Sequence, residues 1–212
     1  MKHIKSLMLG ATLFASSISF GNTYTNDNDL VWTYTTSSGK ATLTGVSNVD
    51  GTALDGSLTI PSSVNGVTVE AIGVNAFQDM AITNLVFEEG LKTIESGAFA
   101  NCTALEALTL PDSLTTINGG GYGHYGAFNG CTALTSVHLG SGLVMIGNGY
   151  GADRDDNPDP FAYCGVFGNC INLEEVTFGP NLLKIGHHAF SECHALALWS
   201  DCLPLKEYLW SL

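Results

Sequence analysis

The stretch that decides the fold is AFANCTALEALTLPDSLTTI, residues 98–117. It opens with an Ala-Phe pair and a cysteine, continues as LxxLxL from Leu105, and ends as LxxI from Leu114. The alternation of apolar residues is typical of short, half-buried strands, and the Ala-Phe segment is compatible with a helical turn or two that buries Phe and Cys. One such unit cannot bury its own apolar side, so the stretch predicts stacking against further copies.

Copies of this unit recur along the chain. The Ala-Phe pair, once replaced by Val-Phe, stands at Ala76-Phe77, Ala98-Phe99, Ala127-Phe128, Val166-Phe167 and Ala189-Phe190. Three residues after the last four Phe residues come Cys102, Cys131, Cys170 and Cys193. The Phe-to-Phe spacings are 22, 29, 39 and 23 residues, so two units carry insertions of 6 and 16 residues. A period of this length predicts stacked repeats with columns of Phe, Cys and aliphatic residues, and rungs about 5 Å apart.

The repeat resembles that of the BspA-like leucine-rich-repeat proteins of bacterial surfaces, approximately LxxIxLPxxLxxIGxxAFxxC. LEALTLPDSLTTI at 105–117 and IGHHAFSEC at 185–193 match this pattern, and residues 32–73 look like the β-rich lead-in of such proteins. The resemblance implies an α/β fold: a right-handed leucine-rich-repeat solenoid with short parallel strands, short helical turns and an N-terminal β lead-in. It also implies a role in adhesion or host-protein binding.

The chain divides into four predicted segments. Residues 1–21 carry Lys2 and Lys5, then a short apolar run and small residues, which is the pattern of a secretory signal peptide. The other segments are an N-terminal β-rich cap (22–66), five repeats (67–198) and a C-terminal cap or truncated repeat (199–212). After Leu196 the repeat spacing is expected to be lost, and the apolar residues there could cover the last rung: Trp199, Leu205, Tyr208, Leu209 and Trp210.

Composition narrows the class of protein and its partners. Of 212 residues 45% are hydrophobic and only 13% charged, which suits one folded domain with a continuous core. Without residues 1–21 the chain keeps five basic and 20 acidic residues, a formal charge of −15, which argues against nucleic acid as a partner. We expect an exported monomer, secreted or at the cell surface, with no membrane span and a protein or glycan partner.

No catalytic motif emerges. There is no GxSxG, and packing explains the repeat cysteines, which we expect to be buried free thiols. Cys164 and Cys202 lie off the repeat positions and are the better disulfide candidates. The sequence therefore predicts a protein that is not an enzyme.

Two regions are candidate binding surfaces. The insertions at 118–126 and 147–165 occupy the same register of consecutive repeats and should lie side by side, presenting aromatic residues on Gly-rich loops. These residues are Tyr122, His124, Tyr125, Tyr150, Phe161 and Tyr163. The second region is the exposed positions of the LxxLxL strands, which are polar and mildly acidic: Glu106, Thr109, His138, Glu175 and Thr177.

The second insertion also holds the only candidate metal ligands. Asp153, Asp155, Asn157 and Asp159 alternate like the start of a calcium-binding loop, but Cys164 stands where such a loop has its bidentate Glu. A solvated acidic loop is the alternative, and no other cofactor is indicated. The leading function is a non-catalytic, adhesion-type binding module. The alternatives are a structural spacer or fragment of a larger surface array, and a calcium-dependent binder.

Overall fold

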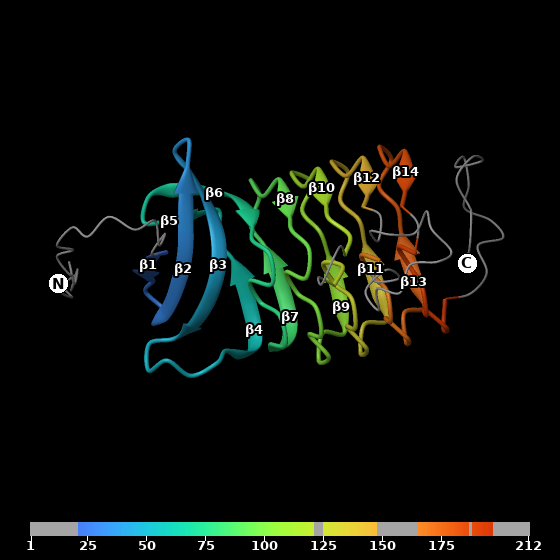
Figure 1. Ribbon diagram of the computed structural model, residues 1–212, viewed down its shortest axis with the longest axis horizontal. Coiled ribbons are helices and arrows are strands. Elements are labelled where there is room, and N and C mark those ends of the chain that lie inside the picture. Colours follow the sequence, from blue (N-terminus) through green and yellow to red (C-terminus); the bar gives the residue numbers. More distant parts are fainter. Residues whose placement is uncertain (1–20, 121–124, 148–164, 187, 197–212) are drawn as a thin grey trace, which may run out of the picture.

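The computed structural model describes residues 21–120, 125–147, 165–186 and 188–196, and Figure 1 shows their strands following one another along the long axis. The predicted signal peptide lies outside these residues. The strands are β1 (Asn22–Thr25), β2 (Leu30–Ser37), β3 (Lys40–Asn48), β4 (Asp55–Ile60), β5 (Ser63–Val64), β6 (Val67–Ile72), β7 (Ala81–Phe87), β8 (Thr93–Ile94), β9 (Ala107–Thr109), β10 (Thr116–Ile117), β11 (Ser136–His138), β12 (Met145–Ile146), β13 (Glu175–Thr177) and β14 (Lys184–Ile185).

The strands form two sheets. Sheet A has the order β1-β2-β3-β6-β8-β10-β12-β14, with β5 paired to β6, and is parallel from β3 onward. Sheet B has the order β4-β7-β9-β11-β13 and is parallel throughout. Each repeat supplies one strand to sheet B and the next to sheet A. The result is a strand-rich repeat fold of parallel sheets.

The N-terminal strands cover one end of the core. Strands β1 to β3 pair antiparallel and bury Trp32, Tyr34 and Leu43. The Trp32 ring meets Phe77, the first ring of the repeats, edge-on at 6.2 Å and 88°. Strand β4, within the segment expected to be a cap, is already the first strand of sheet B, because its Leu58 pairs in register with Leu85 of β7.

The core consists of like residues stacked on like. In sheet B, Leu108 pairs with Val137 and Val137 with Val176, and sheet A aligns an isoleucine in each repeat strand. The Phe rings form a continuous column, with centroids 5.2, 5.2, 5.5 and 5.3 Å apart from Phe77 through Phe99, Phe128 and Phe167 to Phe190. This column and its spacing confirm the prediction from the Ala-Phe repeat.

The Ala-Phe segments are turns, and no helix occurs within the described ranges, so the expected helical turns are not confirmed there. Every second N–H group donates to a carbonyl within the same turn, as Ala100 does to Gly97 at 3.0 Å. The N–H of Phe99, the residue before Ala100, donates instead to the carbonyl of Ala127 in the next repeat at 2.7 Å. In an α-helix each of these N–H groups would donate to a carbonyl within the same helix. The residue two after each Phe also has positive φ, which breaks a right-handed helix: Asp79 (61°), Asn101 (58°), Gly130 (75°), Asn169 (58°) and Glu192 (61°).

Glycine is required where both insertions rejoin the stack. Gly126 is the last residue of the first insertion, and a Cβ there would overlap the carbonyl oxygen of Gly165. Gly165 is the last residue of the second, and a Cβ there would overlap the carbonyl oxygen of His188. The three backbones are therefore in direct contact at this point, so larger residues do not fit.

Candidate binding surface

The outward side of sheet B aligns predicted site residues into rows. Thr109 of β9 pairs with His138 of β11, which pairs with Thr177 of β13, and all three side chains are exposed. Two residues earlier on β13, the exposed Glu175 pairs with Ser136. The structure thus brings together four of the five strand residues that the sequence indicated.

The fifth residue, Glu106, begins a further row just before these strands. Thr135 donates its N–H to the Glu106 carbonyl at 2.9 Å, and Glu174 donates to the Thr135 carbonyl at 2.9 Å. Glu106 and Glu174 are both exposed. Thr135, Ser136 and Glu174 are further outward strand positions that the repeat pattern indicates, and the structure places them in the same rows.

Other acids near sheet B hold repeats together. Glu88 accepts from the Ser62 N–H and hydroxyl, both at 2.7 Å, and these hydrogen bonds lower the pKa of its carboxyl. Asp112 accepts from the Ser141 N–H at 2.8 Å, which likewise lowers its pKa. By contrast, no described residue donates a hydrogen bond to the carboxylates of Glu106, Glu174 and Glu175.

The charged side chains on the described part of sheet B, apart from His138, are all acidic. The lysines within the described ranges lie on sheet A or next to it: Lys40, Lys92 and Lys184. Lys40 is paired with Glu70 at 2.8 Å. Among the residues that the structure describes, sheet B therefore carries acids and hydroxyls with no lysine or arginine.

The predicted sites in the insertions fall mostly outside the described residues. Tyr125 is described and half-buried. The other aromatic candidates lie outside: Tyr122, His124, Tyr150, Phe161 and Tyr163. So does the whole calcium candidate: Asp153, Asp155, Asn157 and Asp159. Within the part of the chain that the structure describes, no three His, Cys, Asp or Glu residues are grouped so that they could hold a metal ion.

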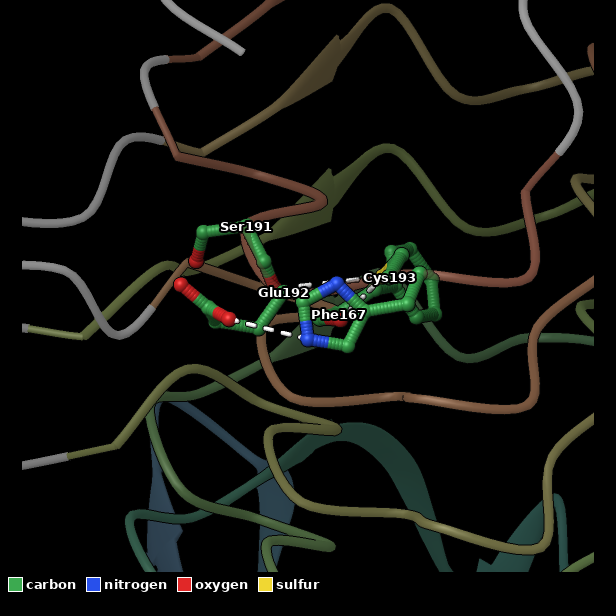
Figure 2. Close-up of polar contacts among 5 residues, drawn as sticks. Phe167, Ser191, Glu192 and Cys193 are labelled. Carbon is green, nitrogen blue, oxygen red and sulfur yellow. Dashed lines mark hydrogen bonds and ion pairs between the residues drawn. The ribbon is translucent and has the colours of Figure 1, made fainter.

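The repeat cysteines are free thiols that belong to the core. Cys102, Cys131 and Cys170 are fully buried and Cys193 is half-buried, which confirms the prediction for these four. Each Sγ donates to the carbonyl of the Phe one repeat earlier, at 3.1 to 3.4 Å, and Figure 2 shows the last pair, Cys193 and Phe167. Burial raises the pKa of every one of these thiols. Cys164 and Cys202 lie outside the described residues.

The described segments contain no helix of sufficient length and apolar character to cross a bilayer.

The repeats match a known family. The model described as "BspA type Leucine rich repeat region" matches residues 53–150 and 163–199, in six copies. The chain belongs to the BspA-type leucine-rich-repeat family. The Ala-Phe pairs indicate five repeats. The sixth copy agrees with the inclusion of β4 in sheet B, because the match begins at residue 53, just before β4. Among curated proteins no sequence matches the chain.

Solved structures of bacterial leucine-rich-repeat proteins are similar to this chain. A leucine-rich repeat protein from Bacteroides ovatus is 22% identical with a TM-score of 0.48, over 79% of this chain and 44% of its own. A leucine rich cell surface protein from Faecalibacterium prausnitzii is 20% identical with a TM-score of 0.45, over 83% and 53%. The T. pallidum leucine rich repeat protein is 17% identical with a TM-score of 0.40, over 82% and 91%. The chain thus spans about half the length of the first two.

Proposed function

We propose that this chain is an exported, surface-associated module that binds a protein or a glycan through the outward side of sheet B, without catalysis. The observation that carries the proposal is the in-register row of Thr109, His138 and Thr177, beside the exposed acids Glu106 and Glu175. Family membership supports a binding module, because repeat proteins use such extended surfaces for recognition.

The chemistry of this surface favours a polar partner. Parallel strands about 4.8 Å apart hold hydroxyl, imidazole and carboxylate groups at fixed spacing, so the donors and acceptors are ordered before binding. Among the described strands of sheet B, the large apolar side chain that is exposed is Val86 of β7, at 45% exposure. A surface of this kind suits hydrogen bonding to a protein or glycan rather than insertion of an apolar segment.

Two finer features belong to the same proposal. We infer a right-handed solenoid, because a connection between parallel strands of one sheet is right-handed in nearly all proteins and these sheets grow by such connections. We infer export from Lys2, Lys5 and the apolar run after them, and adhesion from the family.

The test is binding to arrays of purified matrix proteins and surface glycans by matched variants of the mature protein. One variant carries Thr109→Arg, His138→Arg and Thr177→Arg on sheet B. Its control carries Thr93→Arg and Thr116→Arg on the outward side of sheet A, where Thr93 pairs with Thr116. We expect the unmodified protein and the sheet A variant to bind the same partner and the sheet B variant to lose at least tenfold in affinity.

Other outcomes separate the remaining hypotheses. Equal binding by both variants, together with loss when residues 119–125 and 150–164 are shortened to repeat length, would place recognition in the insertions. If the unmodified protein binds nothing on either array, the chain is a structural spacer, and the proposed function is wrong.

A further inference from the structure

Asparagine followed by glycine is a reactive pair, and the structure describes three such pairs. The backbone nitrogen after an asparagine can attack the side-chain amide, and glycine has no side chain to hinder that approach. The reaction needs a side-chain amide that can rotate and a glycine nitrogen that is free of other bonds. The described pairs are Asn65-Gly66, Asn118-Gly119 and Asn129-Gly130, and Asn148-Gly149 lies outside the described residues.

Contacts between repeats hold the reacting groups of the pair at Asn118 in place. The Asn118 side chain donates from Nδ2 to the Glu95 carboxylate at 2.6 Å, which fixes the amide. The nitrogen of Gly119 lies close to the next repeat, because a Cβ on Gly147 would be only 2.7 Å from it. Attack at this pair therefore requires the repeats to separate.

The pair at Asn129 is held even more firmly. The Asn129 side chain is only 2% exposed. The N–H of Gly130, which would have to attack, donates to the Gly168 carbonyl of the next repeat at 2.8 Å. The Asn129 carbonyl accepts from the N–H of Asn101 at 2.8 Å, so the main chain is fixed on both sides.

The pair at Asn65 has none of these restraints. Asn65 and Gly66 form the exposed two-residue turn between β5 and β6, with φ of 48° and 76°. No described residue forms a hydrogen bond with the Asn65 side chain or the Gly66 N–H. A Cβ on Gly66 would meet no atom within 4 Å, so the space around the turn is open. Because β5 has only two residues, local opening of this hairpin costs little.

We propose that Asn65 is a site of spontaneous covalent modification, at which the folded protein converts asparagine into aspartate and isoaspartate with water as the co-reactant. The Gly66 nitrogen forms a bond to Cγ of Asn65 while the C–N bond of the side-chain amide breaks. The proton of Gly66 leaves with the NH2 group as ammonia, and a cyclic imide remains. Water then adds to either carbonyl of this ring, and opening gives aspartate or isoaspartate.

The two products differ in their effect on the fold. Aspartate adds one negative charge and tolerates the left-handed backbone of this turn, as asparagine does. Isoaspartate adds a methylene group to the main chain, so the turn no longer fits the pairing of Val64 with Val67. Val64 is fully buried in the core. The isoaspartate form therefore loses packing that the aspartate form keeps.

Peptide mass spectrometry of the mature protein, incubated at pH 8 and sampled over days, tests the site. We expect Asn65 to convert at least tenfold faster than Asn118 or Asn129 in the folded protein, and all three to convert at similar rates in guanidinium chloride. Asn65→Gln should remove the fast reaction, because glutamine would have to close a larger ring. Asn118→Gln is the matched control and should leave the fast reaction unchanged. Equal rates at the three sites in the folded protein, or conversion of Asn65 only in denaturant, would overturn the proposal.

Separation of the products tests the effect on the fold. The Asn65→Asp variant should keep the urea midpoint of the natural chain, whereas the isoaspartate form, isolated by anion exchange, should have a lower midpoint. An isoaspartate form as stable as the natural chain would overturn the predicted loss of packing at Val64.

Discussion

The buried cysteines act as hydrogen-bond donors as well as packing groups. Each thiol is fixed to the Phe carbonyl of the preceding repeat, so it links two rungs in addition to filling space. Burial raises the pKa of Cys102 to about 12 and that of Cys193 to about 12. The thiolate, which is the reactive form, is therefore scarce at neutral pH.

Alkylation should reveal this protection. In a Cys164→Ser, Cys202→Ser background at pH 8, we expect the four repeat thiols to react with iodoacetamide much more slowly in the folded protein than in urea. Cys193, the half-buried one, should react first. Peptide mass spectrometry over time gives the order, and labelling of Cys131 as fast as Cys193 would contradict the burial argument.

The left-handed backbone at Asn169 provides a second test at this scale. Its φ is 58°, and its N–H donates to the Ser191 carbonyl at 2.8 Å. Alanine tolerates this conformation poorly, so Asn169→Ala should destabilise the protein by about 1–2 kcal/mol. Asn169→Gly keeps the conformation accessible and should cost less than about 1 kcal/mol. Urea unfolding of both variants measures the difference, and equal losses would contradict it.

Between strands, carboxylates join one repeat to the next. Glu89 accepts from the N–H groups of Asp112 and Ser113 at 3.1 and 2.9 Å, and Asp112 accepts from Ser141. These contacts lie at the turn that leads from sheet B to sheet A, so they fix the same turn in successive repeats. These hydrogen bonds reach their full strength only when the carboxylates are ionised.

The stability of the fold should consequently depend on acid pH. The pKa of Asp112 is lowered from its ordinary value of 3.8, and that of Glu88 from 4.5. A lowered folded-state pKa contributes stability that is present above the ordinary value and is lost as the pH falls through the folded-state value. We expect the stability difference between the natural chain and an Asp112→Asn, Glu88→Gln variant to shrink as the pH drops below 4.5, and to shrink further below 3.8. A difference that stays constant in urea titrations across this range would refute the role of these carboxylates.

Most strands could be predicted from the sequence, and the turns could not. The LxxLxL and LxxI segments form strands because their Leu, Val and Ile residues alternate with other residues. In a strand, this alternation places the apolar side chains on one side, which can be buried. The Ala-Phe segment carries no comparable signal. Its Ala and Phe are compatible with a helical turn, and the deciding fact, that Phe99 N–H bonds to Ala127, is a contact between repeats. The one local clue was the asparagine at position 101, because Asn adopts positive φ more readily than most residues, and its φ is 58°.

The candidate site was predictable to a similar degree. Thr109, His138 and Thr177 occupy equivalent positions in their repeats, so alignment of the repeats was enough to place them in one row. The sequence did not predict which acidic residues bond to a neighbouring repeat and which are exposed without such a bond. Glu88 and Glu89 follow β7 directly, and Glu174 and Glu175 stand at the start of β13. Only the hydrogen bonds from Ser62 and Ser113 distinguish the structural carboxylates from the exposed ones.

Over the whole molecule, the Phe column makes stability depend on position along the axis. Phe128 lies between Phe99 and Phe167 and is fully buried, whereas Phe190 is half-buried at the end of the described column. Phe128→Ala should cost about 3–5 kcal/mol, because it opens a cavity between two rings. Phe190→Ala should cost less, since less area is lost from the core. Urea unfolding at one pH compares the two, and a larger loss at Phe190 would contradict a core that is best packed in its middle repeats.

The glycine contact where the insertions return has a consequence for how this scaffold varies. Backbone contacts at Gly126 and Gly165 fix the position at which each insertion rejoins the stack. These contacts do not depend on the length of the insertion. Loops of 6 and 16 extra residues already share that point. Because lengthening a loop costs only about 0.6 kcal/mol per doubling, new loops can be exchanged there while the columns stay unchanged. The same junction is therefore a grafting position, at which foreign peptides of different lengths can be displayed side by side.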